Sequence, residues 1–404
     1  MTPQSLDDAR RAILDATSPL QPIELPLAEA YGCVAAAEVV TDYDIPPFSA
    51  AEVDGFAARS ADIVAASEGA PARLRISGWA LAGRPPEVTV GWGEAVRITA
   101  GAPVPAGADC IVAEDVAEVE AEEVLVSEAV RADSHIGPAG SDLPAGSVLV
   151  PEGRRLAAAE LGLLATAGYG AVLSYPKLRV GVIALGDLVE PGRDAAFGQA
   201  RDASSYLLLG ALREVGAVPN RIGIVGSIEK DLHDVVTSNA LRADAFVVAG
   251  GEPGSTETVA SALSLGDIRT YVVAVHPGGE LGHGVVEGKP FFHLAGDAAS
   301  AFVAFDVFVR PAVLKMMGRR DRGRPELTAI LDAPVSGPSG AALYVPANLE
   351  YTGGAWHCTP TGPAGEGHLA SFVRASGVLV VPAGDTEVAA GTEVQVQVLR
   401  APQR

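Results

Sequence analysis

Cysteine is scarce in this sequence, and long apolar runs, clustered histidines and positive charge are also lacking. The three cysteines, Cys33, Cys110 and Cys358, are odd in number and far apart, which predicts neither a disulfide framework nor a cysteine metal cluster. No apolar run reaches membrane-spanning length, and the first residues lack the basic segment and apolar core of a secretion signal. The seven histidines are scattered without ligand spacing. We therefore expect a cytoplasmic protein with no direct membrane insertion, and the sequence assigns no metal site.

The charge balance also excludes classes of partner. The formal net charge is −21, which argues against a nucleic-acid surface and favours a soluble, self-repelling particle. With 404 residues, 48% of them hydrophobic, the chain can bury several cores. Two to four domains are expected.

The chain is organised around residues 178–317. An apolar run begins at Leu178, after Pro176, and leaves through Gly186 and Asp187, which is typical of a strand buried on both faces in a parallel sheet. Similar short runs alternate with helix-like segments, and a long helix closes the stretch. This alternation predicts a doubly wound α/β domain. The expected strands are 221–225, 245–249, 271–275 and 291–294, and the expected helices are 204–215, 229–241 and 298–317.

Three glycine-bearing loops follow strands of this domain, at 185–187, 250–254 and 276–280. Ligands bind such domains beyond the carboxyl ends of the strands, and glycine-rich turns can present backbone N–H groups to phosphates. The glycines would also serve simply as tight turns. Their recurrence at three strand ends favours an anion pocket, although the dinucleotide-binding fingerprint is absent.

The flanking regions have different patterns. A helix begins after Ser5 with an apolar face that includes Ala9 and Ile13, and a second helix is expected at 157–167. Residues 71–130 contain short alternating runs, which predict a small all-β insert, either a barrel or a sandwich. The arginine-rich segment 318–325 is expected to be a solvated hinge. A second all-β domain follows it.

Several motifs carry a family resemblance. They are Ile45-Pro-Pro-Phe48, Asp54-Gly-Phe-Ala57, the stretches 97–109 and 186–192, and the end of the closing helix at 305–317. In this order they resemble the MoeA/gephyrin family across nearly the whole chain. The resemblance implies an elongated homodimer whose active site lies between the α/β domain of one subunit and the β insert of the other. Its enzymes insert molybdate into adenylylated molybdopterin with Mg²⁺ and release AMP.

The resemblance also implies four domains in each subunit. Residues 1–45 with 135–175 would form an N-terminal α-rich domain, and 46–134 a β insert domain. Residues 176–320 would form an α/β domain like a molybdopterin-binding domain, and 321–404 a C-terminal β-barrel domain. The expected fold class is therefore α/β and all-β multidomain.

The sequence departs from the family at positions that should contact phosphate, molybdate or Mg²⁺. Ala100 stands where the family has threonine, Thr258 stands in an aspartate position, and the loop 276–280 has lost both family lysines. The loop around Asp187 reads as if a glutamate were deleted. Charge-assisted hydrogen bonds contribute about 1.5–3 kcal/mol each, so losing two lysines would weaken a phosphate ligand by roughly a hundredfold. Carboxylates have also entered these loops, which opposes an oligo-anion; they are Glu252, Glu280 and Asp297.

These replacements resemble the gephyrin-like branch of actinobacteria, which is used as a scaffold and is associated with the division protein FtsZ. Our main hypothesis is a dimeric scaffold with a vestigial anion pocket and no catalytic residue. The alternative is an active molybdopterin molybdenumtransferase that uses Asp54 and Asp187 with Mg²⁺ and molybdopterin. An unrelated α/β module for a small metabolite ranks last. The pocket residues would be Asp54, Thr99, Gly101, Gly186, Asp187, Gly250, Gly251, His276, Gly278 and Ser300.

The scaffold hypothesis includes a partner site. In the family's scaffolding members a short peptide lies between the C-terminal β domain of one subunit and the N-terminal helix of the other. By this resemblance, Arg10 and Ile13 would face Pro382 and Val388, and the ligand would be the C-terminal tail of FtsZ or a similar peptide. The competing interpretation is that Pro382 ends a core strand and Val388 packs inward.

Overall fold

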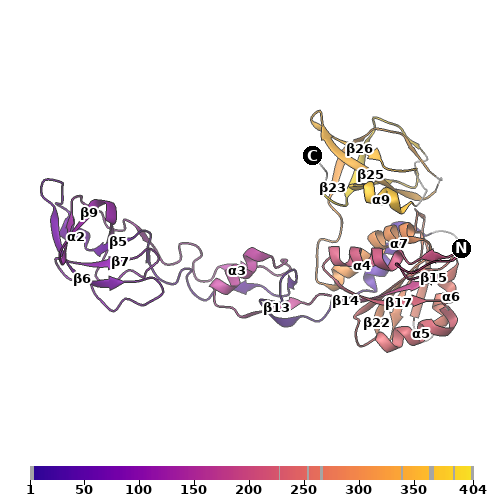
Figure 1. The fold of residues 1–404 in the computed structure, drawn as a ribbon, viewed down its shortest axis with the longest axis horizontal. Coiled ribbons are helices and arrows are strands. Elements are labelled where there is room, and N and C mark those ends of the chain that lie inside the picture. The colour runs from indigo at the N-terminus through magenta and orange to yellow at the C-terminus, as the bar shows by residue number, and fades with distance from the viewer. Residues whose placement is uncertain are drawn as a thin grey trace. The chain divides into compact units, whose positions relative to one another are not determined.

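The computed structural model describes residues 4–226, 228–252, 254–263, 267–337, 340–363, 368–384 and 387–401 (Figure 1). The chain divides into two compact units. Unit 1 contains Met1–Ala37, Gly153–Ala157 and Ala171–Arg404, and unit 2 contains Glu38–Glu152 and Ala158–Gly170. No helix in the described ranges is long and apolar enough to cross a membrane.

The central sheet of unit 1 has the order β17-β14-β18-β22-β21-β19. The strands β17 (Val218–Val225), β14 (Arg179–Leu185), β18 (Ala245–Gly250) and β22 (Lys289–Leu294) are parallel. This confirms the predicted doubly wound α/β architecture.

The strand β21 (Glu280–Val286) was not predicted. It runs antiparallel to both β22 and β19 (Asp267–Val272). Glu287 and Gly288 join β21 to β22 with positive φ angles of 51° and 70°. Such a two-residue turn matches the twist of a hairpin and is too short for a parallel crossover. The connection therefore fixes the direction of β21.

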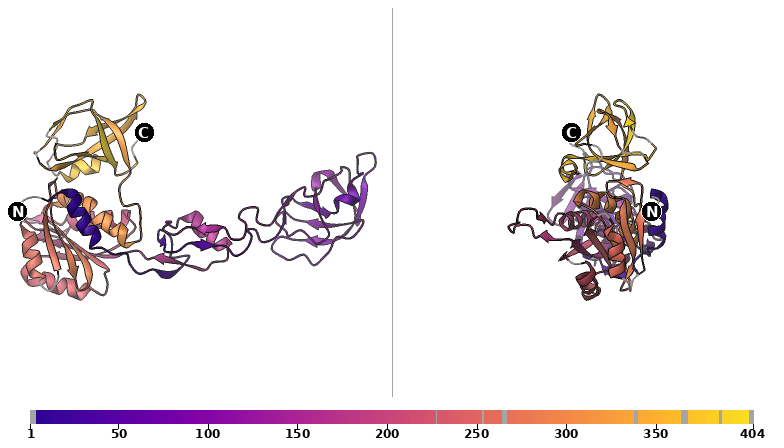
Figure 2. Two further views of the ribbon diagram at one scale, coloured as in Figure 1. Left: turned by 180° about the vertical axis from the view of Figure 1, so that it is seen from behind. Right: turned by 90° about the vertical axis from the view of Figure 1, so that its right-hand side faces the viewer.

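Helices cover both faces of this sheet (Figures 1 and 2). α4 (Ser204–Glu214) and α7 (Ala298–Ala304) pack on one face, while α5 (Ile228–Asn239) and α6 (Ser255–Ala262) pack on the other. Along β14, Val180 and Val182 pack into the core under α4 and α7, and Ile183 and Leu185 pack into the core under α5 and α6. Alternate side chains of a strand point to opposite faces, so a strand buried on both sides must be apolar throughout.

The predicted closing helix is continuous but irregular. It comprises α7, a π-helical turn η2 (Phe305–Val309) and α8 (Arg310–Met316). Pro311 has no backbone N–H, and the wider turn before it accommodates the missing hydrogen bond. The first helix, α1 (Leu6–Asp15), is capped by Ser5 Oγ, which accepts from Asp8 N at 3.1 Å, and it packs on η2 and α8.

The C-terminal part of unit 1 is a closed barrel, as predicted. Its strands are β25 (Ala342–Thr352), β26 (Ala355–Pro360), β23 (Glu326–Leu331), β29 (Glu393–Val398) and β27 (Gly377–Val381). Closure occurs because β25 pairs with both β26 and β27. The helix α9 (Leu369–Arg374) packs beside β25, and β20 (Val275–His276) extends the sheet.

Three smaller sets of strands also belong to unit 1. β15 (Leu188–Val189) pairs with β16 (Ala200–Arg201). β1 (Ile23–Pro26), β13 (Ala171–Tyr175) and β2 (Val34–Ala35) form one sheet. β24 (Val335–Ser336) pairs with β28 (Glu387–Val388).

Unit 2 contains the predicted all-β insert. Its main sheet has the order β8-β5-β7-β6-β10-β9, with cores on both faces. The strands are β5 (Gly55–Ala58), β6 (Ala72–Ala80), β7 (Glu94–Ile98), β8 (Cys110–Ala113), β9 (Ala117–Glu120) and β10 (Glu123–Val126). The predicted helix appears as α3 (Ala158–Thr166).

Candidate functional site

A cavity lies at the carboxyl ends of β14 and β18. These strands are neighbours, with Leu185 opposite Gly250, while the chain leaves β14 for β17 on its other side. This is the point where the direction of winding reverses, the usual ligand site of an open α/β sheet. The cavity has a volume of about 570 Å³, within the range of small-molecule sites. Its lining is Leu185, Leu188, Ala200, Arg201, Ala203, Ser204, Gly250, Gly251, Gly296, Asp297, Ala298, Ala299, His368, Leu369 and Ala370.

The glycines of this rim are required by close packing. Gly250 has a φ of 113°, and a Cβ there would lie 2.4 Å from the carbonyl oxygen of Leu185. Gly251 O accepts a hydrogen bond from Gly296 N at 3.2 Å, and the ring Nε2 of His293 lies 3.0 Å from Gly250 O. Burial lowers the pKa of His293, so the neutral ring donates to this carbonyl. The glycine loop is therefore held rigidly.

One helix terminus near this rim is filled by a carboxylate of the chain itself. Glu280, at the start of β21, accepts from Gly254 N at 2.9 Å and from the Thr256 hydroxyl at 2.7 Å at the beginning of α6. Burial opposes ionisation, but these hydrogen bonds lower the pKa of Glu280 below its usual value. The N–H groups that could receive a phosphate at α6 are thus already engaged.

Two further helices have an aspartate that accepts a hydrogen bond from a backbone N–H of the first turn. Asp297 accepts from Ser300 N at 2.8 Å at the start of α7, and Asp202 accepts from Ser205 N at 3.0 Å at the start of α4. Asp297 also lines the cavity. The positive ends of these helices are consequently compensated within the chain.

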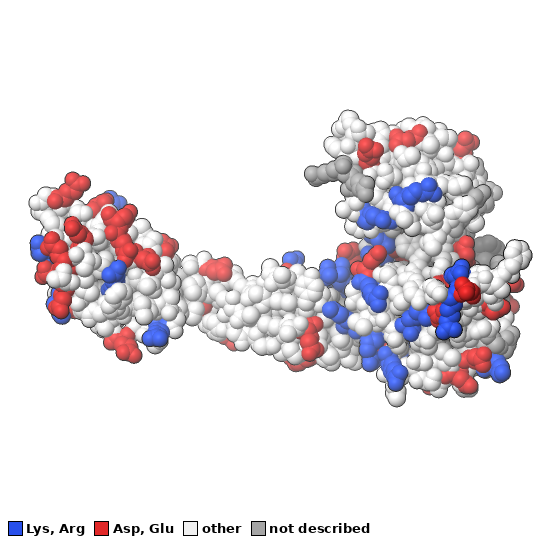
Figure 3. Space-filling view, viewed as in Figure 1, with Lys and Arg blue, Asp and Glu red and all other residues white. Residues whose placement is uncertain are grey.

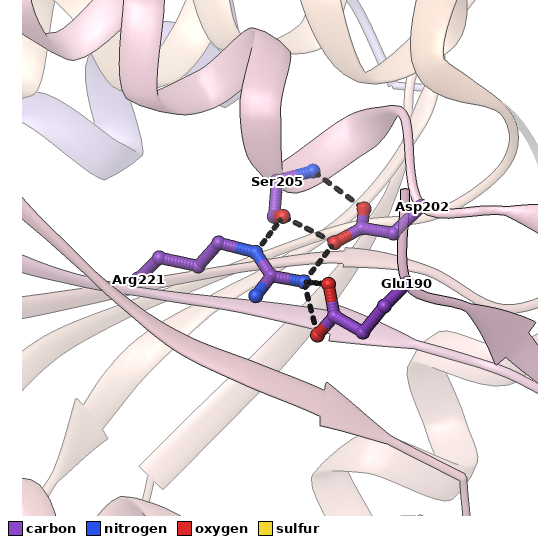
Figure 4. Close-up of polar contacts among 4 residues, drawn as sticks. All are labelled: Glu190, Asp202, Ser205 and Arg221. Atoms are coloured by element: carbon purple, nitrogen blue, oxygen red, sulfur yellow. Dashed lines mark hydrogen bonds and ion pairs between the residues drawn. The ribbon is translucent and has the colours of Figure 1, made fainter. Parts of the chain in front are cut away.

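A partly buried ionic network supports the α4 side of the cavity (Figure 4). Arg221 donates from Nε to Ser205 Oγ at 2.8 Å and from Nη2 to Asp202 and Glu190 at 2.8 and 2.9 Å. Ser205 Oγ also donates to Asp202. Burial disfavours the charge of Arg221, but the hydrogen bonds to Asp202 and Glu190 raise its pKa. This network fixes the segment that contributes Arg201, Ala203 and Ser204 to the cavity.

The structure separates the predicted pocket residues into two groups. In unit 1, only Gly250 and Gly251 of the predicted residues line the cavity. Gly186 and Asp187 follow β14, with Asp187 exposed. The loop of His276 and Gly278 packs on α7 instead: a Cβ on Gly278 would lie 2.4 Å from the carbonyl oxygen of Ser300.

Unit 2 holds the other group. Asp54 Oδ1 accepts from Ala100 N at 2.7 Å, and Thr99 Oγ1 accepts from Ala82 N at 3.0 Å. Gly101, with a φ of 80°, donates its N–H to Ala51 O. These residues form one turn whose polar atoms largely stabilise the turn itself. Across the described ranges, no set of three His, Cys, Asp or Glu side chains is placed to hold a metal ion.

The predicted partner-binding residues require a correction. Ile13 is fully buried against the closing helix, so it offers no surface to a peptide. Val388 is half-buried and packs against the barrel core, which matches the competing interpretation of this residue. Pro382 is exposed directly after β27, and Arg10 is partly exposed on α1. The neighbouring Asp385 and Thr386 lie outside the described residues.

Sequence reasoning missed several contributors to the cavity. Arg201 and the segment 368–370 were not predicted, and the latter comes from the C-terminal barrel region, 74 residues after the end of β22 at Leu294. The network around Arg221 had a weak signal, since a charged residue stands at the start of the otherwise apolar run 221–225. Its partners Glu190 and Asp202 could not be inferred from spacing.

Comparison with known proteins agrees with this architecture. The family description "MoeA N-terminal region (domain I and II)" matches residues 4–168, "Probable molybdopterin binding domain" matches 181–315, and "MoeA C-terminal region (domain IV)" matches 328–399. The protein named molybdopterin molybdenumtransferase 2 of Mycobacterium tuberculosis is 32% identical over 402 residues, covering 97% of this chain and 99% of that protein. Molybdopterin molybdenumtransferase 1 of the same organism is also 32% identical, covering 98% and 99%.

A solved structure shares the fold over nearly the whole chain. It is the molybdopterin biosynthesis MoeA protein from Pyrococcus horikosii, with a TM-score of 0.84, 29% identity and coverage of 99% of this chain and 100% of that one. With full-length relatives above 30% identity and matched regions from one end to the other, this chain belongs to the MoeA family.

Proposed function

We propose that the chain is a molybdopterin molybdenumtransferase acting in molybdenum cofactor biosynthesis. The observation that carries this proposal is the cavity of about 570 Å³ at the switch point of the sheet, in a chain that aligns end to end with relatives bearing that name. Leu185, Leu188 and Leu369 offer apolar walls to a flat pterin, and Arg201 offers a cation to an anionic group.

Adenylylated molybdopterin and molybdate are the substrates in this proposal. Mg²⁺ usually takes one or two carboxylates together with substrate phosphates. The exposed Asp187 would supply one such carboxylate. The ion would then lower the negative charge of the adenylyl phosphate, while the residues of the chain bind and orient the substrate.

A second candidate function is favoured by Glu280. Its carboxylate accepts hydrogen bonds at the start of α6, so a phosphate can bind at this position only if it displaces the carboxylate. This supports the gephyrin-like scaffold hypothesis with a degenerate pocket. Arg10 and the exposed Pro382 remain as surface residues for a short peptide such as the FtsZ tail.

One pair of measurements separates the two candidates. AMP release from adenylylated molybdopterin that depends on molybdate, and that falls in Asp187→Asn, supports the enzyme. No release, together with saturable binding of an FtsZ tail peptide that a dimeric Pro382→Arg variant loses, supports the scaffold. Failure of both measurements contradicts both proposals. Growth of a strain lacking molybdenum insertase, when supplied with this chain, is the matching test in cells.

The proposed assembly for either function is a homodimer. The family resemblance supports it, and light scattering at micromolar concentration tests it. A monomer would contradict the dimer proposal without deciding which function holds.

A further inference from the structure

The arginine-rich segment 318–325 is solvated only in part: Arg320, Asp321, Gly323 and Pro325 are exposed, whereas Arg324 is largely buried. The side chains of Arg310 and Arg324 are only 15% and 10% exposed. Together with neighbouring arginines they line a cavity of about 370 Å³ between α1, the closing helix and the barrel strands β23 and β29. Its charged lining consists of Arg10, Arg310, Arg320, Arg322 and Arg324, with Asp306 and Glu326.

Contacts within the chain hold these arginines in place. Arg324 Nε lies 2.7 and 2.8 Å from the two oxygens of Asp306, and Arg310 Nη1 donates to Arg322 O at 2.8 Å. Arg10 Nε donates to Val307 O at 3.2 Å. Each of these hydrogen bonds uses one nitrogen of a guanidinium group that carries five N–H donors. The cluster is therefore preorganised and keeps donors for a ligand.

Carboxylates compensate this cluster incompletely. Arg10, Arg310, Arg322 and Arg324 face Asp306 and Glu326, a formal charge of +2 in a chain whose net charge is −21. Asp306 is shared by Arg324 and Arg310, and one oxygen of Glu326 accepts from Gln397 Nε2 at 3.1 Å. Asp7 lies 3.9 Å from Arg10 but is 81% exposed, where an ion pair contributes little.

Burial makes this imbalance costly. It lowers the pKa of Arg310, and Arg324 and Arg319 add to the effect while Asp306 and Asp321 oppose it. Buried charges need a partner, and an anion would provide one. The basic character is local: unit 2 has 21 Asp and Glu against 6 Arg, a net charge of −15, whereas Lys and Arg gather over unit 1 (Figure 3).

We propose that this arginine cluster binds a small molecule through an oxyanion of the phosphate class. Guanidinium groups match phosphate oxygens in pairs, and the volume suits a compact phosphorylated ligand. The acidic remainder of the chain would repel nucleic acid. This cavity shares no lining residue with the one at the sheet edge, so the proposal does not depend on the proposed molybdenumtransferase activity.

Calorimetric titration of the full chain tests the proposal, with inorganic phosphate, pyrophosphate and adenosine triphosphate as separate probes at matched ionic strength. Saturable binding of at least one probe is expected. The double variant Arg10→Gln/Arg322→Gln should bind at least tenfold more weakly, because it loses two charged donors. The three probes distinguish free phosphate, a diphosphate group and a nucleotide as the source of the anion.

Arg11→Gln is the matched control, since it removes an exposed arginine of α1 that lines neither cavity. It should bind like the wild type. Binding lost in this control but retained in the double variant would overturn the proposal, as would the absence of binding by all three probes. Should the double variant not fold, Glu326→Gln replaces it: removing a negative charge from the lining should tighten binding, and unchanged or weaker binding overturns the proposal.

Discussion

The carboxylate of Glu280 accepts hydrogen bonds from both the hydroxyl and the backbone N–H of Thr256, at 2.7 and 3.3 Å, and so joins β21 to the first turn of α6. A carboxylate 24 residues along the chain thereby acts as a helix cap. An anionic ligand that binds at this turn therefore has to displace the Glu280 carboxylate.

Glu280→Ala should lower the unfolding free energy by about 1 kcal/mol at neutral pH, as expected for the loss of a helix cap. The folded-state pKa of Glu280 lies below its usual 4.5, so its stabilisation is present above that value and is lost as the pH falls through the folded pKa. Urea denaturation at neutral and strongly acidic pH measures this. A wild-type advantage that persists in strong acid would contradict the prediction. Glu257→Ala, exposed on the same helix, is the control and should change stability by at most about 0.5 kcal/mol.

Arg221→Met should destabilise unit 1 by about 3–5 kcal/mol, because it leaves the fully buried carboxylate of Asp202 without its cation. Chemical denaturation measures the loss. The neighbouring strand offers a matched comparison in Arg179, which pairs with Asp244 at 2.7 Å but is 51% exposed. Arg179→Met should cost about 1 kcal/mol or less. Equal losses of unfolding free energy in the two variants would show that burial does not determine how strongly the Arg221 network stabilises the protein.

The cysteines should be unreactive in the folded protein. Burial raises the pKa of Cys110 and Cys358 to about 12 and also raises that of Cys33. The thiolate is the reactive form, so alkylation at mildly alkaline pH should label none of them until denaturant is added. Mass spectrometry of the labelled protein checks this, and modification before unfolding would refute the prediction.

His283 should make the protein sensitive to acid. It is 4% exposed beside Phe292, and burial, with a smaller contribution from Arg269, lowers its pKa to about 4. The unfolded chain binds the proton near 6.5, so stability is full above that pH and falls by about 3 kcal/mol between 6.5 and 4. His283→Phe keeps a ring there but cannot titrate. Its unfolding free energy should depend less steeply on pH over this interval, and parallel curves for the two proteins would contradict the prediction.

Much of the fold follows from local sequence patterns. The continuous apolar run of β14 permits only a strand covered on both faces, and Ser5 followed by the spacing of Ala9 and Ile13 fixes α1. β21 escaped prediction because Gly282, His283 and Gly284 interrupt its apolar pattern. The direction of that strand depends on the turn at Glu287 and Gly288.

The order of the elements, the family and the absence of family lysines from the loop 276–280 all follow from the sequence alone, since each depends on residue identity and spacing along the chain. The places where charges meet are set by the folded structure. Glu280 reaches α6 because β21 lies beside it, Arg221 neutralises Asp202 because β17 lies under α4, and Arg10 joins Arg310 because α1 packs on the closing helix. Electrostatic and hydrogen-bond energies depend on distances of a few ångströms and on burial, and for residues far apart in sequence these are set by packing alone.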